Sequence, residues 1–139
     1  MGFAFQERQL VLPNRDNSQS TIFEKGESLS LGNSVYDAIN NNTRFSKDYR
    51  LTNQIQGAAV SVMSNIAEGF SRRSSKEFIQ FLFISKSSAA EVQSQLYVAL
   101  DQNYITKKVF EDLYAKAESV SKLNSGFIKY LKTLPNKPK

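Results

Sequence analysis

Residues 51–69 read LTNQIQGAAVSVMSNIAEG and decide the fold of this chain. Their apolar residues recur at steps of four, three, one, three and four, which gives the single apolar stripe of an amphipathic helix: Leu51, Ile55, Ala58, Ala59, Val62 and Ile66. Small residues from Gly57 to Ser61 crowd this stripe and its edges, and we expect them to let a neighbouring helix approach closely. Gly69 is predicted to end the helix by taking the left-handed conformation that other residues resist.

A longer helix is predicted after a short link. Ser74 and Glu77 form a capping box, in which each side chain satisfies a backbone N–H at the helix start. Asn103 and Tyr104 close this helix. Its main stripe consists of Phe78, Phe81, Leu82, Ala89, Val92, Leu96 and Leu100, continued by Ser85 and Ser88. Because Ile79, Phe83 and Ile84 lie off that stripe, the helix is apolar on more than one side.

Two further helices complete the predicted architecture. The first runs over residues 23–40, is weakened by Gly26 and Gly32, and ends at the polar run 40–43. The last begins with Thr106 as its cap and runs to about residue 131, before Pro135 and Pro138 forbid further winding. Short links between helices, without a strand pattern, predict an all-α, antiparallel four-helix bundle.

The bundle is assigned to residues 23–134. Residues 1–22 are predicted to be an irregular N-terminal extension, because turn formers and small polar residues fill positions 13–20. Residues 135–139 are predicted to be a flexible C-terminal tail. A chain of 139 residues fits this one bundle domain rather than two.

Composition removes most catalytic chemistry. The chain contains no cysteine and no histidine, so disulfides, structural zinc sites and the common nucleophile–base pairs lose their residues. Metal sites in helical bundles combine carboxylates with histidines, and this chain has no histidine to join Glu68, Glu77 and Glu91. We expect no metal, cofactor, catalytic residue or small-molecule substrate. No stretch approaches the roughly 18 apolar residues of a membrane span, and no signal peptide pattern is present. These features predict a non-catalytic cytoplasmic protein.

The tightest basic cluster comprises Arg72, Arg73 and Lys76, in a chain with a net charge of +5. The cluster lies just before or within the first turn of the long helix, where free N–H groups and the helix dipole favour anions. Our hypothesis is that it contacts RNA or DNA phosphates. A solvated turn without a ligand is the alternative, and a ring of several copies would favour the phosphate site because the charges would add.

Asn65, Glu68 and Gly69 form a polar motif at the end of the preceding helix. In one interpretation they make a functional site, with Glu68 orienting Arg72 or Arg73. In the other, Asn65 and Glu68 bind backbone groups of the link and Gly69 ends the helix. We favour the second, because half-buried polar side chains usually satisfy backbone groups left unpaired at helix ends.

A resemblance to a known family rests on five short segments. They are Leu51–Ile55, Ala58–Ser61, Ser64–Gly69, Arg72–Phe78 and Phe81–Leu82. Together they strongly resemble the "four helix bundle protein" family, first noticed as proteins encoded within intervening sequences of bacterial 23S ribosomal RNA genes. The function of that family is poorly defined, and older labels call its members ribosomal-protein-like.

The resemblance, which is densest over residues 45–105, implies an up-down-up-down, left-handed bundle that forms homopentamers. A related accessory protein of diversity-generating retroelements shares that architecture and binds nucleic acid and a reverse transcriptase. This chain departs from the family pattern in two places. Met63 replaces the usual proline, which implies a straighter helix, and Lys86 replaces a glycine, which bears on how closely the helices pack.

Ile79, Phe83, Ile84 and Tyr97 offer apolar surface beyond one bundle seam. They could belong to a wide core stripe, or they could form a subunit interface. Given the family resemblance, we favour the interface of a homo-oligomer, a pentamer.

The function we expect is an oligomeric helical scaffold that binds RNA or a ribonucleoprotein through the basic turn. The alternative is a protein–protein adaptor with no direct nucleic-acid contact. An enzyme comes third, because no reaction can be named.

Overall fold

The computed structural model describes residues 26–135, and these residues form five α-helices and no strand. The helices are α3 (Glu27–Asn40), α4 (Thr43–Lys47), α5 (Tyr49–Phe70), α6 (Ser75–Asp101) and α7 (Lys107–Lys132). The predicted all-α class is therefore confirmed. The predicted N-terminal extension at residues 1–22, and residues 136–139 of the predicted tail, lie outside the described residues.

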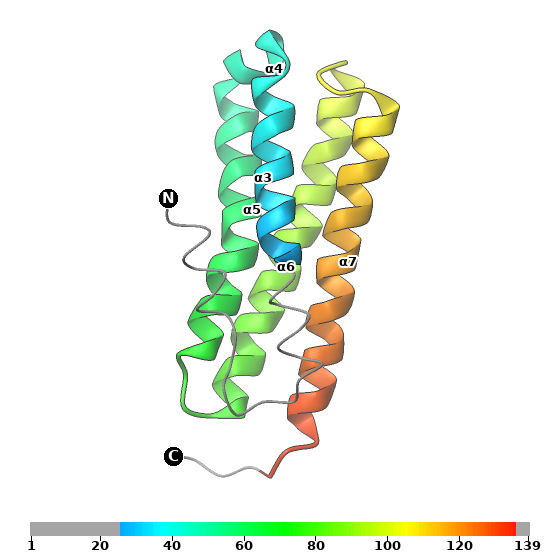
Figure 1. Ribbon diagram of the computed structural model, residues 1–139. Helices are drawn as coiled ribbons and strands as arrows, with labels where there is room; N and C mark the ends of the chain where they lie inside the picture. Colours follow the sequence, from blue (N-terminus) through cyan, green and yellow to red (C-terminus); the bar gives the residue numbers. More distant parts are fainter. Residues whose placement is uncertain (1–25, 136–139) are drawn as a thin grey trace.

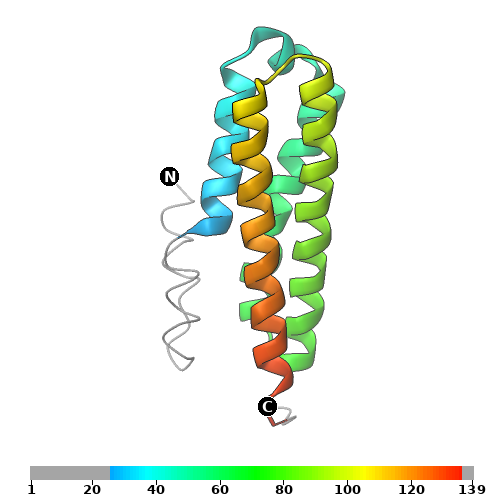
Figure 2. The same cartoon turned by 90° about the vertical axis from the view of Figure 1, so that its right-hand side faces the viewer.

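The four long helices lie side by side (Figures 1 and 2). Helix α5 packs on α3 and α6, and α7 packs on the same two helices. The links around α4 and between α6 and α7 lie at one end, whereas the link from α5 to α6 lies at the other (Figure 1). With 14 residues, α3 is much shorter than α5, α6 and α7, which have 22, 27 and 26.

The core consists of the stripes that the sequence predicts. All six apolar positions of the stripe in 51–69 are buried, and so are most of the facing apolar residues of the other helices. Phe81 and Leu100 of the predicted α6 stripe are only half-buried. Each large side chain removed from water contributes roughly 1.5–3 kcal/mol. Near the α5–α6 link the core is aromatic, since the Phe78 ring centroid lies 5.0 Å from that of Phe127 and 4.8 Å from that of Phe70.

A row of polar groups crosses the middle of this core. The Asn124 side-chain amide donates to Ser85 Oγ at 2.9 Å, and Ser85 Oγ donates to the Val62 carbonyl oxygen at 2.8 Å. Asn124 and Ser85 are both 0% exposed. These two hydrogen bonds connect α7, α6 and α5, so three helices share one buried hydrogen-bonded row.

The predicted helix starts are confirmed at two caps, but the Glu77 carboxylate accepts from Ser74 Oγ and not from the Ser74 backbone N–H. Ser74 Oγ accepts from the Glu77 N–H at 3.2 Å, and Thr106 Oγ1 accepts from the Val109 N–H at 3.1 Å. The close of α6 is also as predicted, because Asn103 takes a left-handed conformation with φ 60°. Its neighbour Tyr104 donates its backbone N–H to the Ala99 carbonyl at 2.9 Å.

Three predictions about glycines are wrong. Gly69 does not end α5 in a left-handed conformation, because the helix continues through Phe70 and its C-cap Ser71 has φ −78°. Gly69 is instead buried where a Cβ would lie 2.5 Å from Phe78 Cδ1, so the close approach of that ring requires glycine. Gly57 faces open space and meets no neighbouring helix.

Gly26 is the third of these glycines. It does not lie within a helix but precedes α3 in a left-handed conformation, with φ 69°. This conformation breaks the helical path at the N-cap, so α3 begins at Glu27 and not at the predicted residue 23.

The short helix α4 was not predicted. Asn42 caps it by accepting the Phe45 N–H at 2.9 Å, and Asp48 then caps α5 through the Leu51 N–H at 3.1 Å. Phe45 is buried and its ring stacks on Tyr104, with 5.2 Å between the centroids. Helix α4 thus connects the α3–α5 link to the α6–α7 link.

Candidate nucleic-acid interface

The basic cluster lies at the link between α5 and α6, at one end of the bundle (Figure 1). Backbone hydrogen bonds from Ser71 to the Glu68 carbonyl and from Arg72 to the Gly69 carbonyl, both 3.1 Å, wind the end of α5 into the link. Ser74 then starts α6. Arg73 therefore belongs to the link, and Lys76 to the first turn of α6.

Arg72 is held by its neighbours. Its Nη2 lies 2.6 Å from Glu68 Oε2, and its Nη1 lies 4.0 Å from Glu77 Oε1. The guanidinium carbon also lies 4.7 Å from the centre of the Phe81 ring. All three charged side chains are more than a third exposed, so water screens the ion pairs and each stabilises the fold only weakly. Arg72 thus connects the end of α5 to the start of α6, and its positive charge is balanced by the carboxylates of Glu68 and Glu77.

Arg73 and Lys76 are different, because both are exposed and neither has a carboxylate within 4.0 Å in the described part of the chain. The three cations and two carboxylates of the turn leave one net positive charge. An anion at this turn would therefore meet Arg73 and Lys76 before Arg72.

The polar motif does not come together as one site. The Asn65 side-chain amide donates to the Ser61 carbonyl at 2.8 Å and to Ser61 Oγ at 2.9 Å, within its own helix and not to the link. Glu68 binds Arg72, as the functional interpretation of this motif supposed. Gly69 provides space for Phe78. The three residues thus have three separate partners.

The predicted interface residues divide into two groups. Phe83, Ile84 and Tyr97 are 46%, 47% and 53% exposed, whereas Ile79 is half-buried and packs against the core of its own chain. Val98, 46% exposed, was missed. It lies two heptads after Ile84, as Tyr97 does after Phe83, so the four exposed residues share one face of α6.

An aromatic cluster surrounds Tyr97. Its ring centroid lies 4.9 Å from that of Phe110 and 5.8 Å from that of Tyr114, and these two α7 rings lie 5.5 Å apart. Charge repulsion from the neighbouring Tyr97 raises the pKa of Tyr114, and burial adds to the effect. Helical spacing within α7 gives no sign of this contact, because it forms between two helices.

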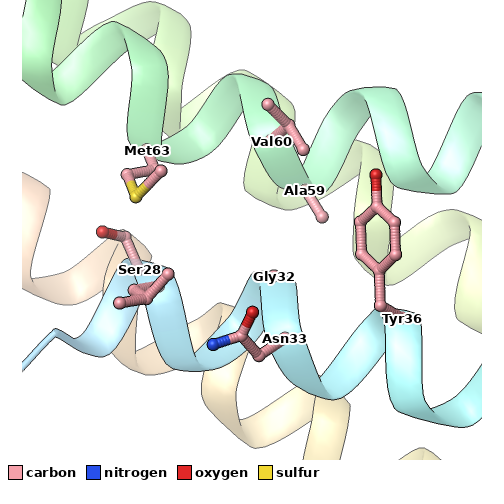
Figure 3. Close-up of a pocket in the computed structure, with 8 residues that line it drawn as sticks. Ser28, Gly32, Asn33, Tyr36, Ala59, Val60 and Met63 are labelled. Carbon is pink, nitrogen blue, oxygen red and sulfur yellow. The ribbon is translucent and has the colours of Figure 1, made fainter. Parts of the chain in front are cut away.

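The described region has one small crevice and two larger open grooves. The crevice between α3 and α5, where Met63 faces Ser28, has a volume of about 10 Å³ and holds at most one water (Figure 3). Two open grooves of about 380 and 350 Å³ follow the α3–α7 and α6–α7 seams. In residues 26–135 no three acidic side chains come close enough to hold a metal ion. No helix in this range has the length and apolarity needed to cross a membrane.

These features define the class of the protein as an all-α bundle with a basic turn at one end and an apolar face along one helix. Residues 22–126 match the family model described as "23S rRNA-intervening sequence protein", and the chain belongs to this family. The family resemblance seen in the sequence is therefore confirmed.

A solved structure supports the same relationship. The chain is 26% identical to a protein of unknown function from the S23 ribosomal protein family of Bacteroides thetaiotaomicron. The match covers 76% of this chain and 97% of that one, with a TM-score of 0.68. Comparison with curated proteins finds no match.

Proposed function

We propose that this chain is a non-catalytic, oligomeric helical scaffold of the cytoplasm that binds RNA or a ribonucleoprotein through the basic turn before α6. The observation that carries the proposal is the pair of exposed cations, Arg73 and Lys76, that have no carboxylate within 4.0 Å in residues 26–135. Lys76 also lies in the first turn of α6, where the helix dipole favours phosphate. The family description, which refers to 23S rRNA, agrees with this partner.

The scaffold in this proposal is an antiparallel, up-down-up-down four-helix bundle with a left-handed twist. Support comes from the packing of α5 and α7 on both α3 and α6, and from links that lie at alternate ends (Figure 1). Such a bundle holds the turn rigidly, because α5 and α6 pack along their length on either side of it.

We also propose that copies of the chain assemble into a ring, a homopentamer, through the exposed face of α6. Ile84, Tyr97 and Val98 are the main apolar contacts of this face, and Ile79 contributes at its edge. Phe83 lies on the same face between two lysines and is treated below. A ring would repeat the basic turn in every copy and so raise the local positive potential.

The test is fluorescence anisotropy of labelled RNA over a salt series. The variant Arg73→Gln/Lys76→Gln should weaken binding and reduce the slope of log K against log salt by about 1–2, because two phosphate contacts are lost. The matched control is Lys107→Gln/Lys122→Gln, which removes the same charge from exposed positions on α7. Arg72 is left intact, since its replacement would disturb the ion pairs of the turn.

The alternative is a protein–protein adaptor with no direct nucleic-acid contact. The aromatic cluster of Tyr97, Phe110 and Tyr114 favours a protein contact, since tyrosine is enriched in interface hot spots. If RNA does not bind at low salt, or if the two double variants weaken binding equally, the basic turn is not a nucleic-acid site and the adaptor is the better proposal.

A further inference from the structure

Phe83 is the exposed aromatic residue of α6 that lies between two cations. Lys86 Nζ lies 5.7 Å from the ring centre and Lys132 Nζ lies 5.9 Å from it, both within the range of a cation–π contact. Lys86 comes from the same helix and Lys132 from the last turn of α7. Since 46% of Phe83 is exposed, this side chain is available to a ligand.

An open groove lies close to this ring and reaches the basic turn. It follows the seam between the start of α6 and the end of α7, has a volume of about 350 Å³, and is lined by Ser75, Lys76, Ile79, Gln80, Leu131 and Lys132, with Leu134 at its edge. Lys132 belongs both to the groove and to the surroundings of Phe83, and Ile79 lies one helical turn before Phe83. The groove and the ring therefore share Lys132 as a common neighbour.

The charge of this surface is uncompensated. Lys76, Lys86 and Lys132 have no carboxylate within 4.0 Å in residues 26–135. An apolar partner pressed onto Phe83 would desolvate these ammonium groups without pairing them, which is costly. A single strand of nucleic acid suits both the lysines and the Phe83 ring, because its phosphates pair with lysines and its unpaired bases stack on aromatic rings.

We propose that single-stranded nucleic acid binds along the α6–α7 seam, with a base stacked on Phe83 and phosphates at Lys76, Lys86 and Lys132. This inference rests on the proposed nucleic-acid binding and extends it from the turn along the seam. A duplex fits less well, because its bases are already stacked on one another and present no free face. RNA and single-stranded DNA share the chemistry required, so both are included in the test.

Tyr49 provides a control on another helix. It is the first residue of α5, at the end of the bundle opposite the basic turn (Figure 1), and is 70% exposed. A substitution at Tyr49 changes an exposed aromatic residue but leaves the lysines of the seam and the proposed contact between copies in place.

The chain contains no tryptophan, so Phe83→Trp introduces a single fluorescent reporter at the proposed stacking position. Its emission should be quenched by oligouridine and by oligothymidine, and much less by an RNA duplex of the same length. Tyr49→Trp should not be quenched by any of the three. Quenching by both single strands would identify the shared base-stacking chemistry, and quenching by oligouridine alone would assign the site to RNA.

Binding of labelled strands by Phe83→Leu gives the second measurement. Loss of the ring should weaken single-strand binding about tenfold and leave duplex binding within about twofold. Lys132→Gln should lower the salt slope for single strands by about 0.7. The mass of Phe83→Leu in solution should equal that of the wild type.

The outcomes separate the two proposals. If the wild type binds no nucleic acid at low salt, both fail. If it binds, but Phe83→Trp is not quenched or Phe83→Leu weakens single strand and duplex equally, only the stacking site is overturned. A lower mass for Phe83→Leu also overturns it, because Phe83 would then lie between copies of the chain.

Discussion

Gly69 and Gly126 both lie inside or near the end of long helices, but their surroundings are opposite. A Cβ at Gly69 would lie 2.5 Å from Phe78 Cδ1, 2.9 Å from Phe78 Cε1 and 3.2 Å from Phe81 Cβ. A Cβ at Gly126 would meet nothing within 4 Å outside its own helix. The first glycine is needed for packing, whereas the second only adds flexibility to the unfolded chain.

Alanine at these positions should therefore change stability in opposite directions. We expect Gly69→Ala to lower the free energy of unfolding by about 1–3 kcal/mol, because the Phe78 ring must move from a packed core. Gly126→Ala should raise it by about 0.5–1 kcal/mol through better helix propensity. Unfolding in guanidinium chloride measures both. A Gly69→Ala protein as stable as the wild type would mean that Phe78 can turn aside freely.

Some features of the basic turn could be predicted from the sequence and others could not. The cluster and its place beside a helix start could be predicted from spacing alone. The pairing of Arg72 with Glu68, four residues apart, could also be predicted, and the functional interpretation of the polar motif included it. The contact of Arg72 with Phe81 could not, because it depends on how the link turns α5 into α6.

At the scale of elements, Tyr104 holds one end of the bundle together. Its hydroxyl donates to Asp48 Oδ2 at 2.9 Å, which ties the α6–α7 link to the start of α5. The hydrogen bond to Asp48 raises the pKa of Tyr104 above its ordinary value of 10.0, and burial adds to the effect. The bond thus depends on a protonated phenol.

Its contribution should disappear in alkaline solution. Below about pH 10 the phenol is protonated in the folded and unfolded states, so the bond stabilises the fold fully. Above that value the unfolded state loses the proton first, and the contribution is lost as pH rises through the folded-state pKa. We expect Tyr104→Phe to be less stable than the wild type at pH 8, with a difference that shrinks above pH 10 in thermal unfolding.

The control for this prediction is Tyr49→Phe, which changes a tyrosine that is 70% exposed. Its difference from the wild type should stay constant over the same pH range. A constant difference for Tyr104→Phe as well would show that the bond to Asp48 contributes nothing to the pH dependence.

Long helices could be predicted from the sequence because each carries a stripe repeated over several turns. Helix α4 could not, since its five residues are too few for a stripe and its cap, Asn42, lies in a polar run that was interpreted as a helix end. What fixes α4 is the stacking of Phe45 on Tyr104, a contact between residues far apart in the chain. The apolar excess of α6 was predicted, but not its division into a lysine-flanked part and an aromatic part.

At the scale of the whole molecule, the exposed face of α6 is where assembly should be sensitive to mutation. We expect Tyr97→Ser/Val98→Ser to lower the mass in solution, because both side chains are about half exposed and belong to the proposed contact between copies. Light scattering coupled to size-exclusion chromatography measures this mass. Tyr49→Ser, at an exposed position on α5, is the control and should leave the mass unchanged. A wild-type chain that is monomeric at micromolar concentration would contradict the assembly.

The buried row of Asn124, Ser85 and the Val62 carbonyl has a consequence for how the bundle can move. Sliding α7 past α6 by one helical turn, about 5.4 Å, would carry the Asn124 amide away from Ser85 and strand it among apolar side chains. The three helices are therefore locked lengthwise. We expect any rearrangement on binding to occur by tilting or hinging at the links and not by shear between helices.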